Sequence, residues 1–287
     1  MFKYGDILKA GTDLLTKRYK YERKVKVETK SRDGVKFTSE GKLAGKGFDG
    51  ILKAEYEQGN LKLNKLELST AGKVAGELTL KGLADGVELS FKAEEGLRTS
   101  GTISAGVLGG SYTADAFRVD ADVDLINGPT LAAAAITKYE GFLVGGHAKF
   151  NVAPKEGADG LEDFGFALGY DGADFRAAAT TTGKLAGVNV GLHHAVDANV
   201  AVAAGVSFAL PSKDGGETDP WTLAVGGSYK LGADSDVQAK FSSDGTIAAN
   251  YQAKLNTCAT LTLAASVDAA NLGGDKHQLG LTLGFSG

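Results

Sequence analysis

Large apolar residues alternate with small or polar residues through almost the whole chain, and this alternation constrains the fold more than any other feature. The stretch from Gln278 to Phe285 shows it, because Leu, Leu, Leu and Phe stand at every second position. A β-strand places successive side chains on opposite faces. This stretch therefore predicts a strand with one apolar face and one small, polar face.

The same period of two recurs from Lys24 onward. It is clearest in 117–125, where apolar residues alternate with Arg118, Asp120, Asp122 and Asp124. Further segments with this pattern are 24–30, 35–40, 73–81, 87–94, 200–210, 223–231 and 261–267. We expect nineteen strands, each taking roughly 14 residues with its turn, which suits the roughly 9–11 residues of a membrane-spanning barrel strand.

Pairs of Asp or Asn with Gly punctuate the strands. Such pairs adopt the positive φ angles that two-residue hairpin turns require, so we expect sequential strands to be antiparallel. The pairs are Asp33-Gly34, Asp49-Gly50, Asp85-Gly86, Asn127-Gly128, Asp159-Gly160, Asp171-Gly172, Asp214-Gly215 and Asp244-Gly245.

Composition supports a continuous sheet and excludes several classes of protein. The 287 residues include 41 Gly and only 4 Pro, as a hydrogen-bonded sheet with tight turns requires. Cys258 is the only cysteine, so neither an internal disulfide nor a cysteine metal cluster is possible. The net charge of -4 predicts no nucleic-acid specificity. We expect no secretory signal and no spanning helix, because no apolar run approaches eighteen residues.

A short helix is expected before the strands. Ile7, Leu8, Gly11, Leu14 and Leu15 recur at helical spacing, and polar residues lie opposite them. Asp6 and Asp13 argue against a mitochondrial transit peptide, since such peptides are poor in acids. We therefore divide the chain into a helix with its linker, residues 1–23, and a β-barrel, residues 24–287.

Alternation alone does not separate a membrane barrel from a soluble β-sandwich. In a sandwich the apolar faces pack against each other, whereas in a membrane barrel they meet lipid around a wet lumen. We favour the membrane barrel, because no long crossover connection interrupts the pattern and an apolar final strand would be a bare edge unless the sheet closed. A soluble β-protein that binds a ligand is the alternative.

Several segments, taken in order, resemble the mitochondrial porins, the voltage-dependent anion channels. They are Tyr4-Gly5-Asp6, Asp13-Leu14-Leu15-Thr16-Lys17, Thr29-Lys30-Ser31, Asp33-Gly34-Val35, Asn127-Gly128-Pro129, Tyr139 to Gly145, and Gly273 to Phe285. The resemblance implies a multi-pass pore in the mitochondrial outer membrane, with the helix inside the lumen and with the nineteen strands known for this family. It also implies passage of ATP, ADP and small anions, closure at raised voltage of either sign, and no cofactor.

The resemblance further implies partners and an alternative. The partners would be the lipid bilayer, further copies of the chain and other outer-membrane proteins. A related mitochondrial protein translocase is the alternative, and it should carry a longer N-terminal extension for its partner subunits.

Conduction needs fixed charge along a wet path and no catalytic group. We expect lumen-facing charges that give a weak anion preference, with a basic sector opposed by acids; each residue could also simply solvate the wall. The set is Lys9, Asp13, Lys17, Lys24, Lys26, Lys30, Lys36, Lys53, Lys73, Lys81, Lys92, Asp120, Asp122 and Asp124. Asp120-x-Asp122-x-Asp124 lacks the glycine and distal glutamate of a calcium loop, and His193-His194 would face opposite ways, so no metal site is expected.

The resemblance assigns two further sets of residues. Gln278, Gly280, Leu283 and Phe285 match the family's sorting signal in the last strand. Nucleotide contact would involve Lys9, Lys17, Gly86, Glu88 and Lys276, although Gly86-Val87-Glu88 reverses the charge of the family's Gly-Leu-Lys.

Two further departures from the family concern flexibility and lipid contact. Residues 18–22 (Arg-Tyr-Lys-Tyr-Glu) replace a glycine-rich hinge after the helix. Lys65 stands where some animal members place a glutamate in the lipid. Leu61 and Leu63 share its face but Leu66 and Leu68 do not, so we expect a β-bulge or snorkelling there.

Overall fold

In the part of the chain that the structure describes, nineteen strands form one sheet that closes on itself as a barrel. The computed structural model describes residues 2–44, 47–95, 103–126, 128–154, 159–210 and 221–287. The strands are β1 Arg23–Lys30, β2 Lys36–Ala44, β3 Gly47–Gln58, β4 Leu61–Ser69, β5 Val74–Lys81, β6 Val87–Glu95, β7 Ile103–Thr113, β8 Phe117–Asp124, β9 Thr130–Tyr139, β10 Phe142–Asn151, β11 Leu161–Asp171, β12 Phe175–Thr182, β13 Gly187–Ala195, β14 Val200–Ala209, β15 Trp221–Lys230, β16 Ser235–Ser242, β17 Thr246–Asn256, β18 Ala259–Asp268 and β19 Gln278–Ser286.

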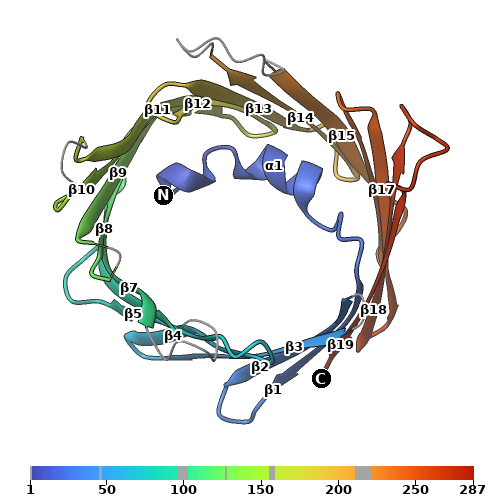
Figure 1. Ribbon diagram of the computed structural model, residues 1–287, viewed down its shortest axis with the longest axis horizontal. Helices are drawn as coiled ribbons and strands as arrows, with labels where there is room; N and C mark the ends of the chain where they lie inside the picture. The colour runs from blue at the N-terminus through green and yellow to red at the C-terminus, as the bar shows by residue number, and fades with distance from the viewer. Residues whose placement is uncertain (1, 45–46, 96–102, 127, 155–158, 211–220) are drawn as a thin grey trace.

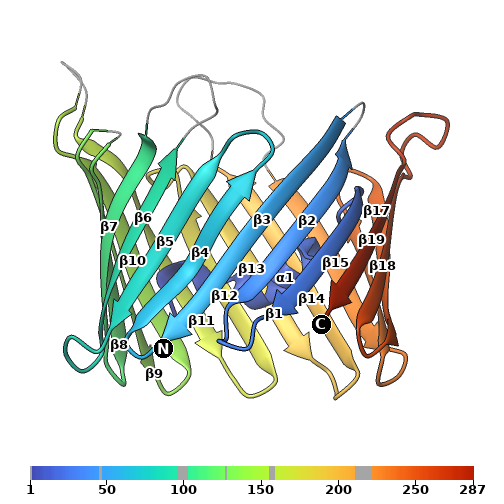
Figure 2. The ribbon, with the colours of Figure 1, turned by 90° about the horizontal axis from the view of Figure 1, so that it is seen from below.

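Sequential strands pair antiparallel and lie tilted around the barrel wall (Figure 2). The predicted strand count and the hairpin topology are confirmed. The closing pair differs, because β1 and β19 run parallel, from Arg23 opposite Leu281 to Glu28 opposite Ser286. An odd number of strands in a meander leaves the first and last strands pointing the same way, so the barrel is mixed and not wholly antiparallel.

The outward face of the barrel carries the apolar residues. Leu279, Leu168 and Phe166 expose 80%, 62% and 58% of their surface, and every strand except β12 carries exposed large apolar side chains. Buried apolar clusters occur, among the described residues, only where the N-terminal segment meets the wall. No second sheet covers the outward face in the part of the chain that the structure describes. The sandwich alternative is therefore wrong, since the apolar faces do not pack on each other.

The N-terminal segment lies inside the barrel (Figure 1). It consists of a 3-10 turn, η1 Tyr4–Asp6, and a helix, α1 Lys9–Thr16, which contacts β13, β14 and β15. Gly11, Leu14 and Leu15 are the buried residues of α1, as the helical spacing predicted. No helix among the described residues is both long and apolar enough to cross a membrane.

The predicted turns are only partly confirmed. Gly34, Gly86 and Gly245 have φ angles of +88°, +76° and +83° in turns, and Gly128 has +74°. Asp49-Gly50 is wrong as a turn, because it lies inside β3, where Asp49 stands opposite Lys42 and the Gly50 amide bonds the Thr70 hydroxyl. Gly160 and Gly172 lie just outside the two ends of β11, between strands as predicted, but neither has a positive φ. Asn127 and Asp214-Gly215 lie outside the described residues.

A β-bulge in β4 determines where Lys65 points. The register with β5 shifts between Leu63 and Lys65, so that Leu63 faces Leu78 and Lys65 faces Glu77. The extra residue, Asn64, hydrogen-bonds the Thr79 hydroxyl at 2.5 Å. The bulge therefore turns Lys65 inward, which confirms the expected bulge and avoids a lysine in the apolar belt.

The outward face gives a direct test of this geometry. Phe91 lies at the middle of β6 between Leu78 and Leu108, with 46% of its surface exposed. Phe91→Lys should lower the stability of the inserted barrel by roughly 2–4 kcal/mol, the cost of a lipid-facing lysine at mid-depth. The measurement is the fraction of protein that folds into vesicles and resists extraction by urea. Ser90→Lys, on the inward face, is the control and should insert normally; equal insertion of both variants would mean that the faces are reversed.

Candidate functional site

The helix rests on a part of the inner wall that is lined by very small residues. Leu14 and Leu15 pack on Ala203, which exposes only 1% of its surface. A Cβ atom placed on Gly191 would come within 2.9 Å of the Leu8 side chain, and one on Gly226 within 3.0 Å of Leu15. Small side chains on β13–β15 therefore create the shallow trough that α1 fills.

The residues that precede α1 are also fixed to the wall. Ile7 packs with Ile136, Leu143 and other buried residues of β9–β12. The Tyr4 ring lies 4.9 Å from that of His147, centroid to centroid. The Phe2 ring lies 4.3 Å below the Arg176 guanidinium, a favourable cation–π contact. The N-terminal segment is thus held at both of its ends and along the helix.

The linker that follows α1 is held by contacts to three strands, in place of the glycine-rich hinge of the family. Arg18 forms an ion pair with Asp236 of β16. Its φ of +68° is a left-handed conformation that favours glycine and costs a side-chain-bearing residue about 1–2 kcal/mol. The ion pair therefore holds Arg18 at a position where glycine would be less strained.

Three further contacts complete this linker clasp, which we define as residues 18–22 with their partners on β16, β19 and β2. Lys240 lies 4.6 Å from the Tyr19 ring centre. The backbone of Lys20 and Tyr21 crosses Gly280 so closely that a Cβ atom there would lie 2.7 Å from the Tyr21 Cα. Glu22 pairs with Lys42 at 2.5 Å. Gly280 is therefore required by the linker as well as matching the sorting signal.

The wall opposite the helix carries charges of alternating sign. Strand register places the predicted lysines of β1–β6 on the inward face, and acids stand beside them. The ion pairs are Lys24–Glu40 (2.5 Å), Lys26–Glu28 (2.7 Å), Lys36–Glu28 (3.4 Å), Lys53–Glu67 (3.7 Å), Lys73–Glu94 (2.7 Å), Lys81–Glu57 (2.8 Å) and Lys92–Glu77 (3.8 Å). This charged wall is a surface of paired charges and not a purely basic sector. Lys30 lies opposite Lys36 at the end of β1.

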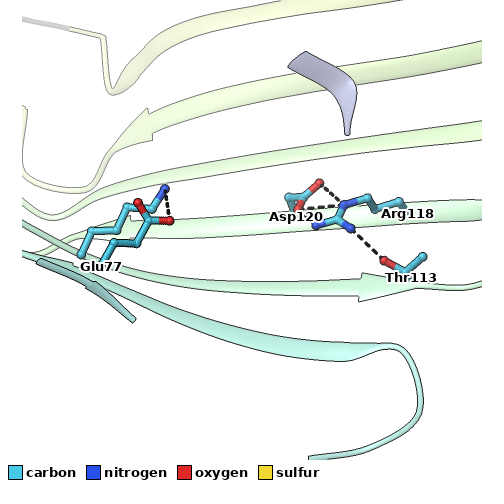
Figure 3. Close-up of polar contacts among 5 residues, drawn as sticks. Glu77, Thr113, Arg118 and Asp120 are labelled. Atoms are coloured by element: carbon cyan, nitrogen blue, oxygen red, sulfur yellow. Dashed lines mark hydrogen bonds and ion pairs between the residues drawn. The ribbon is translucent and has the colours of Figure 1, made fainter. Parts of the chain in front are cut away.

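The predicted acids of β8 border a hollow in the charged wall. Asp120 and Asp122 line a cavity of about 320 Å³, with Glu88 and Lys92 from β6 and with Lys3 from the N-terminal segment. Arg118, 8% exposed, donates to both carboxylate oxygens of Asp120 and to the Thr113 hydroxyl (Figure 3). Asp124, at the end of β8, accepts the Ile126 amide at 2.9 Å. Asp120 and Asp122 thus line this hollow on the inward face.

The charges of α1 are paired within the N-terminal segment. Lys9 bonds Asp6 at 3.0 Å and Lys17 bonds Asp13 at 2.6 Å. The Asp6 carboxylate raises the pKa of Lys9, first through the hydrogen bond and then through its charge. Lys9 therefore stays protonated at every physiological pH, on the side of the helix that faces away from the wall.

The residues suggested for nucleotide contact do not converge. Gly86 and Glu88 lie at the β5–β6 hairpin and Lys276 at the β18–β19 connection. Hairpins that follow odd-numbered and even-numbered strands lie at opposite rims of an antiparallel barrel. Lys9 and Lys17 lie between the rims on α1. Of the sorting-signal residues, Gln278 and Gly280 are on the inward face, whereas Leu283 and Phe285 point outward.

Sequence reasoning missed a cluster on the inward face of β9, β11 and β12. Asp171 bonds both Lys138, at 2.6 Å, and Arg176, at 2.5 Å. The Asp-Gly pattern predicts Asp171 only as part of a turn. The alternation in each strand places these three residues on one face, but only the pairing of distant strands brings them together.

Comparisons with known proteins agree with this architecture. The family model described as "Eukaryotic porin" matches residues 1–280. A rabbit protein (Oryctolagus cuniculus), "Non-selective voltage-gated ion channel VDAC3", is 28% identical over 97% of this chain and 96% of its own. The Drosophila melanogaster "Voltage-dependent anion-selective channel" is 27% identical over 98% of this chain and 97% of its own length.

A fungal relative and a solved structure extend the comparison. The "Mitochondrial outer membrane protein porin" of Neurospora crassa is 28% identical over 98% of both chains. A solved structure described as "Asymmetric conductivity of engineered proteins" aligns with a TM-score of 0.50 at 14% identity, over 78% of this chain and 94% of that one. This last likeness concerns the fold alone.

The linker clasp predicts how firmly the helix is held. Asp236→Asn removes the ion pair of Arg18 but leaves its strained backbone, so the linker should detach more often and trypsin should cut after Lys17 or Arg18 several-fold faster. Gel analysis of limited proteolysis in vesicles measures the rate. Thr12→Ala, on the exposed side of α1, is the control. Unchanged cleavage in Asp236→Asn would show that the ion pair does not hold the linker.

Tyr19 predicts a pH dependence of the clasp. Burial of its phenol, with a smaller effect of Tyr21, raises the pKa of Tyr19 to about 12, against about 10 in an unfolded chain. The clasp is therefore fully stable below pH 10 and loses stability as the pH rises toward 12. The difference in ultraviolet absorbance between the wild type and Tyr19→Phe should show this late titration, and a midpoint near 10 would contradict it.

Proposed function

This chain belongs to the eukaryotic porin family, and we propose that it forms a voltage-gated, weakly anion-selective diffusion pore in the mitochondrial outer membrane. The observation that carries the proposal is a closed barrel with an apolar outward face and a charged inward face. Such a barrel satisfies all of its ladder hydrogen bonds within lipid and encloses an aqueous path. Ions, ATP, ADP and small metabolites are the proposed permeants.

The relatives support a channel over the alternatives. Those of rabbit and fly are described as voltage-gated or voltage-dependent channels, and that of Neurospora as a mitochondrial outer-membrane porin. A protein translocase is not favoured by these relatives. Self-association and contacts with other outer-membrane proteins remain predictions of the family resemblance.

Paired charges on the wall explain a weak selectivity. Each lysine of the charged wall raises the local anion concentration, and the acid beside it lowers it again. The exposed pairs stabilise the barrel by only about 0–1 kcal/mol each. Anion preference therefore arises from small local differences between positive and negative charge along the path. The hollow beside Asp120 and Asp122 is more negative, and the lysines of β1 and β2 make their part of the wall more positive.

Gating by voltage needs charge that moves through the field. One elementary charge crossing the full field gains about 2.3 kcal/mol per 100 mV. α1 itself carries Lys9 and Asp13, with Lys17 at its C-terminal cap and Asp6 just before it, and these charges are paired. Displacement of α1 alone would transfer little net charge, so we place the gating charge in Arg18 and Lys20 of the linker, since the partner of Arg18 stays on the wall.

Current across a planar lipid bilayer tests the proposed pore. Purified protein in a KCl gradient should give large conductance steps, mild anion preference and partial closure at both polarities. Steady, strongly cation-selective steps would instead support a different barrel function. Protein that stays soluble without detergent and carries no current would overturn the pore proposal.

The charged wall predicts the direction of a selectivity change. Reversing Lys24 and Lys26 to Glu removes the partner of Glu40, leaves Glu28 with Lys36 alone, and adds negative charge to the path. The reversal potential in a KCl gradient should move toward that of a cation-selective pore. The matched variant with Glu28 and Glu40 changed to Lys should shift it in the opposite direction. Identical reversal potentials in the two variants would refute a role of this wall in selectivity.

A further inference from the structure

An apolar groove runs along the outward face of the barrel where the sheet closes. Its volume is about 370 Å³, and its walls come from β19, β1, β2 and β3. Val25, Val27, Leu281 and Leu283 form one side, and Phe48 forms part of the other. The groove faces away from the lumen, so it plays no part in the conduction path described above.

Two small residues of β2 account for the groove. Register places Gly41 opposite Val25 and Ser39 opposite Val27, so a row of large residues lies beside a row of small ones. The Phe48 ring folds over Gly41, where a Cβ atom would come within 2.6 Å of the ring. Gly41 therefore allows the ring to lie flat and leaves an open channel of apolar surface between the strands.

One charged side chain lines the groove from the outward face. Arg23 shares that face with Leu281 of β19 and Leu43 of β2, its two register partners. It is exposed and, among the described residues, forms no ion pair or side-chain hydrogen bond. The neighbouring Lys24 differs, because it turns inward to pair with Glu40. Arg23 is thus a free guanidinium beside an apolar surface.

On its β2 side, Arg23 lies close to one rim of the barrel, where a membrane-spanning barrel would meet the lipid headgroups. Leu43, the partner of Arg23 on β2, is followed directly by Ala44. Ala44 stands opposite Gly47 in the last pair of the β2–β3 ladder. One rung is about 3.3 Å along a strand. A basic side chain on the lipid face costs close to nothing at such an interface. A guanidinium binds phosphate oxygens in a planar, two-pronged geometry.

We propose that this seam groove binds a glycerophospholipid, with an acyl chain along Val25 and Val27 beside the Phe48 ring and with the phosphate on Arg23. Charge complementarity identifies the headgroup, and the apolar walls identify the rest of the ligand. Inorganic phosphate alone would leave the groove empty. The proposal rests on the placement of the barrel in a bilayer, which belongs to the proposed function, but not on conduction or gating.

Photo-crosslinking tests the site. Full-length protein is reconstituted in phosphatidylcholine vesicles with a trace of phosphatidylcholine that carries a diazirine in its acyl chain. Irradiation should label the peptides that contain Val25 and Gly41 above the rest of the outward face. Arg23→Gln should reduce this labelling about fivefold, the effect of one interfacial cation. Arg32→Gln, in the turn at the other end of the same hairpin, should leave it unchanged.

A second variant and a second probe separate the two parts of the site. Ser39→Leu fills the groove but keeps Arg23, and it should also reduce the labelling; it keeps the proposal testable if Arg23→Gln assembles poorly. A glycolipid probe with the same acyl chain and no phosphate should label the wild type and Arg23→Gln equally. Millimolar inorganic phosphate should not compete.

Three results would overturn the proposal. They are equal labelling of wild type and Arg23→Gln, labelling spread evenly around the barrel, and competition by inorganic phosphate, which would indicate a simple anion site. Bilayer conductance of the same wild-type preparation distinguishes the two proposals. A conducting wild type with even labelling refutes the lipid site alone, whereas a soluble, non-conducting protein refutes the pore.

Discussion

Closure of the sheet between β1 and β19 is the constraint on which the rest of the structure depends. An open edge would leave backbone amides and carbonyls unpaired in lipid, at several kcal/mol for each group. The parallel ladder from Arg23 to Glu28 removes both edges at once. It extends beyond the strands, because the Leu281 amide bonds the Glu22 carbonyl at 2.9 Å and the Gly287 amide bonds the Glu28 carbonyl at 3.0 Å.

The same seam is also where the N-terminal segment enters the lumen. The linker leaves β1, crosses Gly280 on the inward face of β19, and reaches α1 through Tyr19 and Arg18. Closure of the barrel and the position of the helix are therefore coupled at one place. On the outward side, the same strands leave the groove beside Arg23.

The helix divides the lumen into two unlike sides. Ala203, Gly205 and Gly226 form a trough that α1 covers, so this side contributes little charge to the path. The uncovered side, β1–β8, carries the paired lysines and acids. Permeants thus pass along a wall whose positive and negative charges lie within 4 Å of each other, which favours weak selectivity over tight binding of one ion.

Particular residues show how far sequence reasoning reached. The period of two identified the strands and their faces, because it depends only on the geometry of a single strand. The Asp-Gly turn signal failed at Asp49-Gly50, which resembles a turn but continues β3, since the hairpin is decided by pairing with β2. The alternation also left two interpretations of Lys65, a β-bulge or a snorkelling side chain. The register with β5 shows the bulge. Nor could the alternation pair Asp171 with Lys138, which lies 33 residues away.

Local spacing along the chain is enough to predict alternating strands and an amphipathic helix before them. Closure into a barrel, the parallel seam, the clasp around Arg18 and Gly280, and the cancellation of lysines by acids appear only in the folded molecule. Each of these depends on which distant strands are neighbours and in which register. Pairing of neighbours is a property of the closed sheet as a whole, and no single segment contains it.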